Sequence, residues 1–186
     1  MNLSIDVHVI QSVPPSNLNR DDTGSPKTAV YGGVRRARVS SQAWKRATRR
    51  DFEAHLDTTE FGVRTKRAVE LLADRIGNLR PGIDAAEAQA QATTVLNQAG
   101  LKTKARRKAE SGEPELTEYL VFFSNQQLDK LAALAVESGD SPPNSRAAKG
   151  ILKDGNSFDL ALFGRMVAND ADLNVDAACQ VAHALS

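Results

Sequence analysis

The residues of this sequence whose types and spacing best suggest a binding site are lysines and arginines concentrated in one segment. Residues 23–50 contain eight lysines and arginines and no acid, whereas the whole 186-residue chain has 24 basic and 23 acidic side chains and a formal net charge of +1. A neutral average with one concentrated basic segment predicts that a charged partner is met at a defined place, and a phosphate backbone is the expected one. The eight cations are Lys27, Arg35, Arg36, Arg38, Lys45, Arg46, Arg49 and Arg50.

A helix from about Gln42 to Leu56 is expected to present part of this charge. Ser40 and Ser41 offer an N-cap. At 100° per residue, one helix face carries Gln42, Lys45, Arg46 and Arg49. Free backbone N–H groups at the start of this helix would favour an anion, and the Ser and Gln side chains could donate to phosphate or sugar oxygens.

Asp21 and Asp22 form the only paired carboxylates near the basic segment. Such a pair could hold a divalent metal or act in acid–base catalysis. The alternative is a loop in which the aspartates cap turns and pair with Arg20. The sequence therefore leaves a catalytic and a structural role open at this point.

The other candidate residues match no known catalytic or metal-binding spacing. His8, His55 and His183 are far apart in the sequence, and Cys179 is the only cysteine, so no disulfide can form within the chain. We expect Cys179 to be a small buried core residue. In the segment Phe163–Met166, Gly164 would permit a close backbone approach and Met166 could be an adaptable apolar contact, the alternative being ordinary core.

The hydrophobic pattern predicts the α+β fold class, compatible with a ferredoxin-like sheet that carries a helical insertion. The period of two over residues 3–11 predicts a half-buried first strand, and a long loop follows over 12–29. Polar breaks are expected at 102–113, predicted to be a mobile loop, and at 139–144. Further extended segments are predicted at 29–33, 34–39, 117–123 and 158–166, and further helices at 63–79, 83–99, 125–137 and 175–185.

Composition narrows the class of protein further. Hydrophobic residues make up 41% of the chain, enough for a core, but no run approaches 18 consecutive apolar residues. The first ten residues lack the features of a signal peptide. We therefore expect a cytoplasmic protein with no membrane partner, no metal and no cofactor.

Three blocks of this sequence resemble a known family. PSNLNRDD (Pro15–Asp22), KTAVYGGVRRARVSSQAWKRATR (Lys27–Arg49) and FDLALFGRM (Phe158–Met166), with VAHALS (Val181–Ser186), closely resemble the CasC-type backbone subunit of Cascade. Cascade is the type I-E CRISPR RNA-guided surveillance complex. The resemblance is strong over residues 3–50, moderate over 157–186 and weak between them.

The resemblance implies a fold and a set of partners. Family members have an RRM-like palm, a helical fingers region and a thumb, so it implies a palm at residues 1–57 and 151–186 and a helical, fingers-like insertion at 58–150. Copies would line up along the CRISPR RNA (crRNA) with the other Cascade subunits, displace one guide nucleotide at intervals, and recognise target DNA through the guide for antiviral defence. Family members are about twice as long, so we expect the thumb and last palm strands to be absent here.

The resemblance also implies the site residues. Guide RNA would be contacted through its sugar-phosphate backbone, and no residue would be catalytic. An alternative is the metal-dependent endoribonuclease activity of backbone subunits in type III complexes, for which Asp21 and Asp22 would be candidates; a basic structural or DNA-binding domain is a third possibility. The implied RNA-binding residues are Arg20, Lys27, Ser40, Gln42, Lys45, Arg46, Arg49 and Met166.

Overall fold

The computed structural model describes residues 3–57, 60–105, 112–167 and 170–186. It contains helices and small antiparallel sheets, which confirms the predicted α+β class. The chain divides into two compact units, one made of Met1–Ala47 with Val181–Ser186 and the other of Thr48–Gln180. The family-based division into palm and fingers remains a prediction. Within the described residues, no helix is long and apolar enough to span a membrane.

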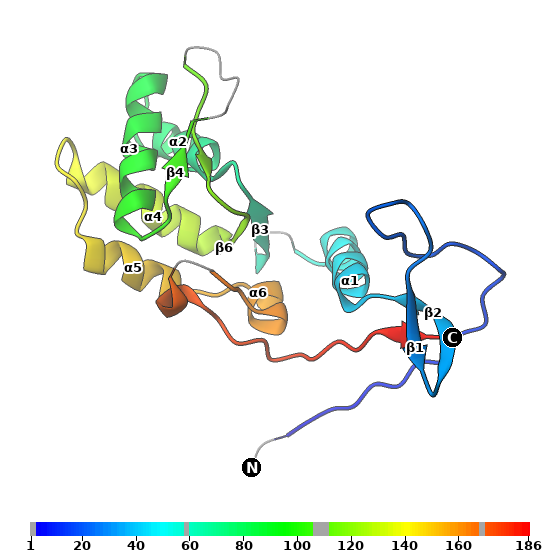
Figure 1. The fold of residues 1–186 in the computed structure, drawn as a ribbon. Helices are drawn as coiled ribbons and strands as arrows, with labels where there is room; N and C mark the ends of the chain where they lie inside the picture. The colour runs from blue at the N-terminus through cyan, green and yellow to red at the C-terminus, as the bar shows by residue number, and fades with distance from the viewer. Residues whose placement is uncertain (1–2, 58–59, 106–111, 168–169) are drawn as a thin grey trace. The chain divides into compact units, whose positions relative to one another are not determined.

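The first unit is built on a β-hairpin (Figure 1). Strand β1 (Thr28–Tyr31) pairs with β2 (Val34–Val39) in antiparallel register, with Tyr31 opposite Val34. Gly32 and Gly33 make the connection with φ of +63° and +77°, the left-handed conformations that a two-residue hairpin turn of type I′ needs. A third short strand, β7 (Ala184–Leu185), pairs with the other edge of β2.

Helix α1 follows β2 almost directly. It runs over Ser41–His55, close to the predicted bounds, and none of its described residues is buried. The boundary between the two units falls within this helix, after Ala47.

The second unit holds the hydrophobic core. Strands β3 and β6 pair antiparallel, as do β4 and β5, and helices α2, α3, α4 and α5 pack on one another (Figure 1). Apolar residues at helical spacing, such as Val69, Leu72 and Ile76 in α2, are fully buried and explain this packing. The elements are β3 (Gly62–Thr65), α2 (Ala68–Leu79), α3 (Ala85–Gln98), β4 (Thr103–Lys104), β5 (Leu116–Thr117), β6 (Val121–Ser124), α4 (Asn125–Ser138), α5 (Ser145–Lys153), α6 (Phe158–Phe163) and a 3₁₀ turn, η2 (Ala171–Leu173).

Ser124 is the N-cap of α4, which begins at Asn125 as the predicted helix over 125–137 does. Its hydroxyl accepts from the Gln127 N–H at 3.0 Å, and the Gln127 amide oxygen accepts from the Ser124 N–H at 3.1 Å. This reciprocal capping box satisfies two backbone donors that the helix itself leaves unpaired.

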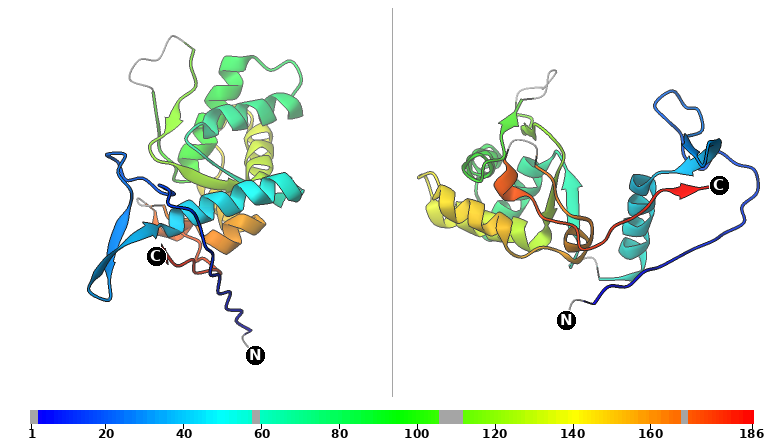
Figure 2. Two further views of the ribbon diagram at one scale, coloured as in Figure 1. Left: turned by 90° about the vertical axis from the view of Figure 1, so that its right-hand side faces the viewer. Right: turned by 60° about the horizontal axis from the view of Figure 1, so that its bottom comes forward.

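The predicted first strand is wrong. Residues 3–11 form no strand, and Figure 2 shows them as an extended trace. Leu3 and Ile5 are 89% and 80% exposed rather than half-buried. A strand needs a neighbour for its backbone hydrogen bonds, and no described strand of this chain pairs with this segment.

Other element predictions are also wrong or incomplete. Residues 63–65 belong to strand β3 rather than to a helix, because they pair with Val121–Phe123. Residues 158–163 form helix α6 rather than a strand, and helix α5 has no predicted counterpart. The polar break at 102–113 contains β4 at one end, while residues 106–111 lie outside the described residues.

Residues 175–185 form an extended segment ending in β7 rather than a helix. The N–H groups of Ala178 and Cys179 donate to the carbonyls of Ala161 and Leu162 in α6, at 3.0 and 2.9 Å. These tertiary bonds replace the helical ones that the apolar spacing predicts. Cys179 is consequently half-buried rather than in the core.

Gly62 provides a test of packing between β3 and β6. A Cβ added there would lie 2.3 Å from the Phe123 carbonyl oxygen and 2.7 Å from a carbon of the Phe122 ring. We expect Gly62→Ala to lower the free energy of unfolding by about 2 kcal/mol, because the backbone must shift. Gly77→Ala in α2 is the matched control, since its Cβ would meet nothing within 4 Å and should stabilise by roughly 0.5–1 kcal/mol. Urea unfolding followed by circular dichroism measures both, and a Gly62→Ala variant as stable as the parent would contradict this packing.

Candidate nucleic-acid interface

The N-terminus of α1 is capped by side chains from two distant segments. Asn19 Oδ1 accepts from the Ser40 N–H at 3.0 Å, and His183 Nδ1 accepts from the Ser41 N–H at 2.9 Å. The Ser40 hydroxyl accepts from the Ala43 N–H at 3.3 Å. The expectation of free N–H groups for an anion is therefore wrong at Ser40 and Ser41, because these donors are already satisfied. Neither Asn19 nor His183 could be recognised as a cap from sequence, since each is more than 20 residues from the helix start.

Two arginines of the hairpin are held by hydrogen bonds within the first unit. Arg35 Nε donates to the Thr28 hydroxyl at 3.2 Å. Arg36 donates to the Tyr31 carbonyl at 3.2 Å and to the Ser186 carbonyl at 2.6 Å. These contacts fix two cationic side chains on β2.

The loop before β1 is organised by Asp21. One carboxylate oxygen of Asp21 accepts from the backbone N–H groups of Thr23 and Ser25, both at 2.9 Å, and from the Thr23 hydroxyl at 2.7 Å. Arg20 donates to the Gly24 carbonyl at 3.0 Å, and the backbone N–H of Lys27 donates to the Asn19 carbonyl at 2.8 Å. The loop thus folds on itself and places Arg20 and Lys27 beside the hairpin. Among the described residues, no group of three His, Cys, Asp or Glu side chains could hold a metal ion.

The pKa of Asp21 provides a test of this loop. The hydroxyl of Thr23 and the loop N–H groups hold the pKa of Asp21 below its ordinary 3.8. The stabilisation by this carboxylate is present above pH 3.8 and is lost as the pH falls through the lower, folded-state pKa. An NMR titration of the Asp21 carboxyl carbon should give a midpoint below 3.8, which Thr23→Val should move upward. An unchanged midpoint in Thr23→Val would contradict the role given to the hydroxyl.

The first half of α1 presents an open polar face. Gln42 and Arg46 are exposed and Lys45 is half-buried, and their spacing places them on one side of the helix, as predicted. With Arg20, Lys27 and the buried Ser40, they bring six of the eight predicted site residues into the first unit.

Arg49 and Met166 belong to the second unit. The Arg49 guanidinium lies over the rings of Phe122 and Phe163, 4.8 and 4.9 Å from their centroids, and its burial lowers its pKa. These cation–π contacts give Arg49 a packing role that its place on the polar helix face does not predict. Met166 is 82% exposed.

The residue before Met166 is a buried arginine. Arg165 is 5% exposed, and its guanidinium donates to the carbonyls of Leu173 at 2.8 Å and Phe122 at 3.2 Å, to Gln127 Oε1 at 3.2 Å and to the Leu152 carbonyl. Burial lowers its pKa to about 10. Its backbone also pairs with Val175. Arg165 therefore fixes the segment that presents Met166.

A cationic hairpin continued by an exposed polar helix face, on an α+β framework, is typical of proteins that bind a polyanion. Comparison of this sequence with known protein families identifies the family to which the chain belongs. The chain belongs to the family described as CT1975-like protein, whose model matches residues 5–186.

Two solved structures contain chains similar to this one. A chain in a structure titled "CRISPR RNA-guided surveillance complex" is 37% identical with a TM-score of 0.74, and the match covers 94% of this chain and 55% of that one. A chain in a structure titled "CRISPR RNA-guided surveillance complex, pre-nicking" is 37% identical with a TM-score of 0.75, covering 92% and 49%. This chain thus spans about half the length of the solved chains. No curated protein matches it. The predicted resemblance to a subunit of a CRISPR surveillance complex is confirmed.

Proposed function

We propose that this protein is a non-catalytic backbone subunit of a type I-E CRISPR surveillance complex that holds guide RNA by its sugar-phosphate backbone. The observation that carries the proposal is the match, over 94% of the chain, to a subunit of a CRISPR RNA-guided surveillance complex. Other subunits of such a complex, target DNA met through the guide, and further copies of this chain would be its partners.

The chemistry of the first unit supports backbone recognition. Its described side chains offer cations and neutral donors, from Arg20, Lys27, Gln42, Lys45 and Arg46, that suit phosphate and 2′-hydroxyl oxygens. Contacts of this kind ignore base identity, so sequence recognition would be left to pairing between guide and target. Asp21 has one carboxylate oxygen engaged in three hydrogen bonds of its own loop, which fits a structural role better than the ribonuclease alternative.

The salt dependence of RNA binding tests the proposal. If about four cations neutralise phosphates, the logarithm of the association constant should fall with the logarithm of salt concentration at a slope of roughly −3. Affinity for a single-stranded guide should then drop about 50-fold between about 50 and 200 mM salt. Fluorescence anisotropy with unrelated guide sequences measures this. A flat response to salt would rule the proposal out.

A further inference from the structure

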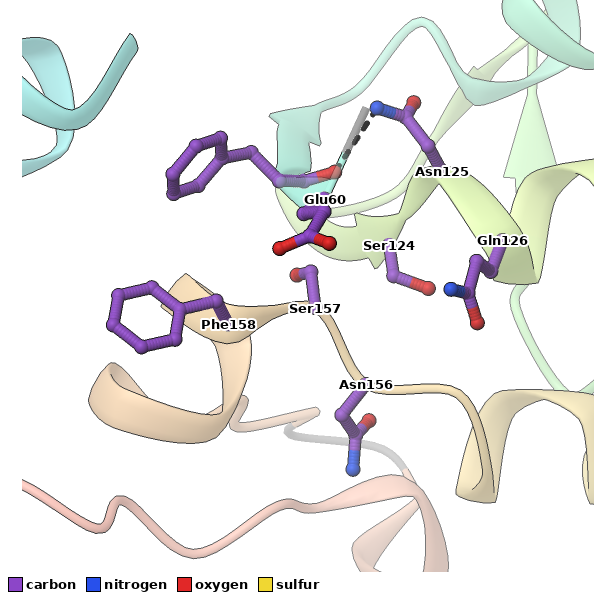
Figure 3. A pocket seen from close by; sticks show the side chains of 8 residues that line it. Glu60, Ser124, Asn125, Gln126, Asn156, Ser157 and Phe158 are labelled. Atoms are coloured by element: carbon purple, nitrogen blue, oxygen red, sulfur yellow. Dashed lines mark hydrogen bonds between the residues drawn. The ribbon is translucent and has the colours of Figure 1, made fainter. Parts of the chain in front are cut away.

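A small open pocket of about 140 Å³ lies in the second unit, where helices α4 and α6 begin. Figure 3 shows the carboxylate of Glu60 between the ring of Phe158 and the polar side chains at the start of α4. Asn156 and Ser157 line the pocket from the segment that leads into α6.

The aromatic side of the pocket is rigid and open to solvent. Phe158 is 50% exposed, whereas Phe61, which also lines the pocket, is 6% exposed. The two rings meet edge to face with centroids 6.3 Å apart, and Phe52 stacks on Phe61 at 5.8 Å. This packing holds the ring of Phe158 in place while leaving part of it available for a ligand.

Several polar groups of the pocket are already used by the fold. Asn125 donates to the Phe61 carbonyl at 3.0 Å and accepts from Arg75 at 2.9 Å, and the Ser157 hydroxyl donates to Asp159 at 2.8 Å. Glu60, in contrast, is exposed and forms no ion pair with any residue that the structure describes. The pocket therefore combines a fixed aromatic ring with an available carboxylate.

This combination fits a guanidinium group. A planar cation can stack on an aromatic ring while it donates two parallel hydrogen bonds to a carboxylate. A phosphate group would fit less well, since Glu60 is the one charged side chain among the described residues that line the pocket. In the sequence around it, residues 51–60 carry the four acids Asp51, Glu53, Asp57 and Glu60 and no lysine or arginine. The sequence thus changes from purely basic to purely acidic charge between residues 50 and 51.

We propose that the pocket binds an arginine side chain of a second copy of this chain. Each copy carries both a pocket with an available carboxylate, at Glu60, and a basic segment at residues 23–50, an arrangement that suits head-to-tail association. The inference rests on the proposed function, because copies aligned along one guide RNA would meet in this way.

A small probe tests the pocket without RNA. N-acetyl-arginine amide, titrated into the protein and followed by NMR, should shift the ring resonances of Phe158 in a saturable way. Glu60→Gln should weaken this binding roughly 5- to 10-fold through loss of the charge-assisted hydrogen bonds. Glu137→Gln, at an exposed acid on α4, is the matched control and should bind as the parent does.

Three results of this titration would overturn the proposal: no saturable binding, equal binding by Glu60→Gln, or tighter binding of the neutral analogue N-acetyl-citrulline amide. Cytidine or guanosine bound more tightly than the arginine probe would identify a base pocket instead, and would equally overturn it. Circular dichroism would establish that both variants are folded.

A second experiment tests the partner. Mass photometry of the protein on an RNA long enough for several copies should show multiple copies for the parent and for Glu137→Arg, but mostly single copies for Glu60→Arg. Anisotropy on an RNA that holds one copy should be unchanged by Glu60→Arg. Multiple copies of Glu60→Arg on the long RNA would overturn the proposal. If the parent bound N-acetyl-arginine amide as expected but bound no RNA, only the proposed function would be overturned.

Discussion

Arg165→Met is expected to lower the free energy of unfolding of the second unit by roughly 3 kcal/mol. Arg165 is 5% exposed, and its guanidinium donates to carbonyls of three separate segments, at Phe122, Leu152 and Leu173. Without it the carbonyls of Phe122 and Leu173 each lose a side-chain donor, at a cost of about 1 kcal/mol or more, while the Leu152 carbonyl keeps only its bond from Gln127 Nε2 at 3.1 Å. The loss is partly offset, because the variant no longer buries a charge, a cost visible in the lowered pKa of Arg165.

Urea unfolding followed by circular dichroism at 222 nm measures this effect, since most helices belong to the second unit. Arg165→Lys should also be destabilised, because an ammonium group cannot reproduce the planar fork of donors. Arg146→Met is the matched control, at an exposed arginine in α5, and should stay within about 0.5 kcal/mol of the parent. An Arg165→Met variant as stable as the parent would show that these hydrogen bonds do not hold the unit together.

Elements with strong local signals could be predicted from the sequence. Gly32 and Gly33 mark the hairpin because the turn needs two positive φ angles, and Ser124 with Gln127 marks the start of α4 through its capping box. In both cases residues within a few positions of one another determine the structure.

Elements that depend on distant partners could not be predicted. Residues 3–11 alternate like a strand but find no neighbour, whereas the apolar residues of 175–185 have helical spacing but pair with α6 and β2. Alternation over the six residues of α6 is too short to distinguish a strand from a helix. Tertiary hydrogen bonds decide these segments, and hydrophobic periodicity does not report them.

In the candidate site, too, features set by nearby residues could be predicted and features set by distant contacts could not. The face formed by Gln42, Lys45 and Arg46 follows from helical periodicity alone. The capping contacts of Asn19 and His183, and the buried position of Arg165, bridge residues far apart in the chain. A single sequence gives residue types and their spacing, but it does not show which distant residues contact each other. The sequence therefore predicts the helix face of Gln42, Lys45 and Arg46 but not the contacts of Asn19, His183 and Arg165.

Lys45→Glu combined with Arg46→Glu is expected to weaken guide RNA binding on the order of 100-fold at low salt, because two attractive phosphate contacts become repulsive. The magnitude of the salt slope should fall by about 1.4, the contribution of two cations on a single strand. Since phosphate contacts carry no base information, unrelated RNA sequences should lose affinity equally.

Lys130→Glu combined with Arg146→Glu is the matched control, because it reverses the same amount of charge at exposed positions of the second unit. If RNA were held only by long-range attraction to positive charge anywhere on the protein, both double variants should lose affinity to a similar extent. That result would contradict an RNA interface on α1. Loss confined to the Lys45 and Arg46 variant, with a shallower salt slope on every RNA tested, is the result that a backbone-binding surface on this helix requires. A loss restricted to one RNA sequence would instead mean that these side chains read bases, which a subunit that leaves recognition to the guide should not do.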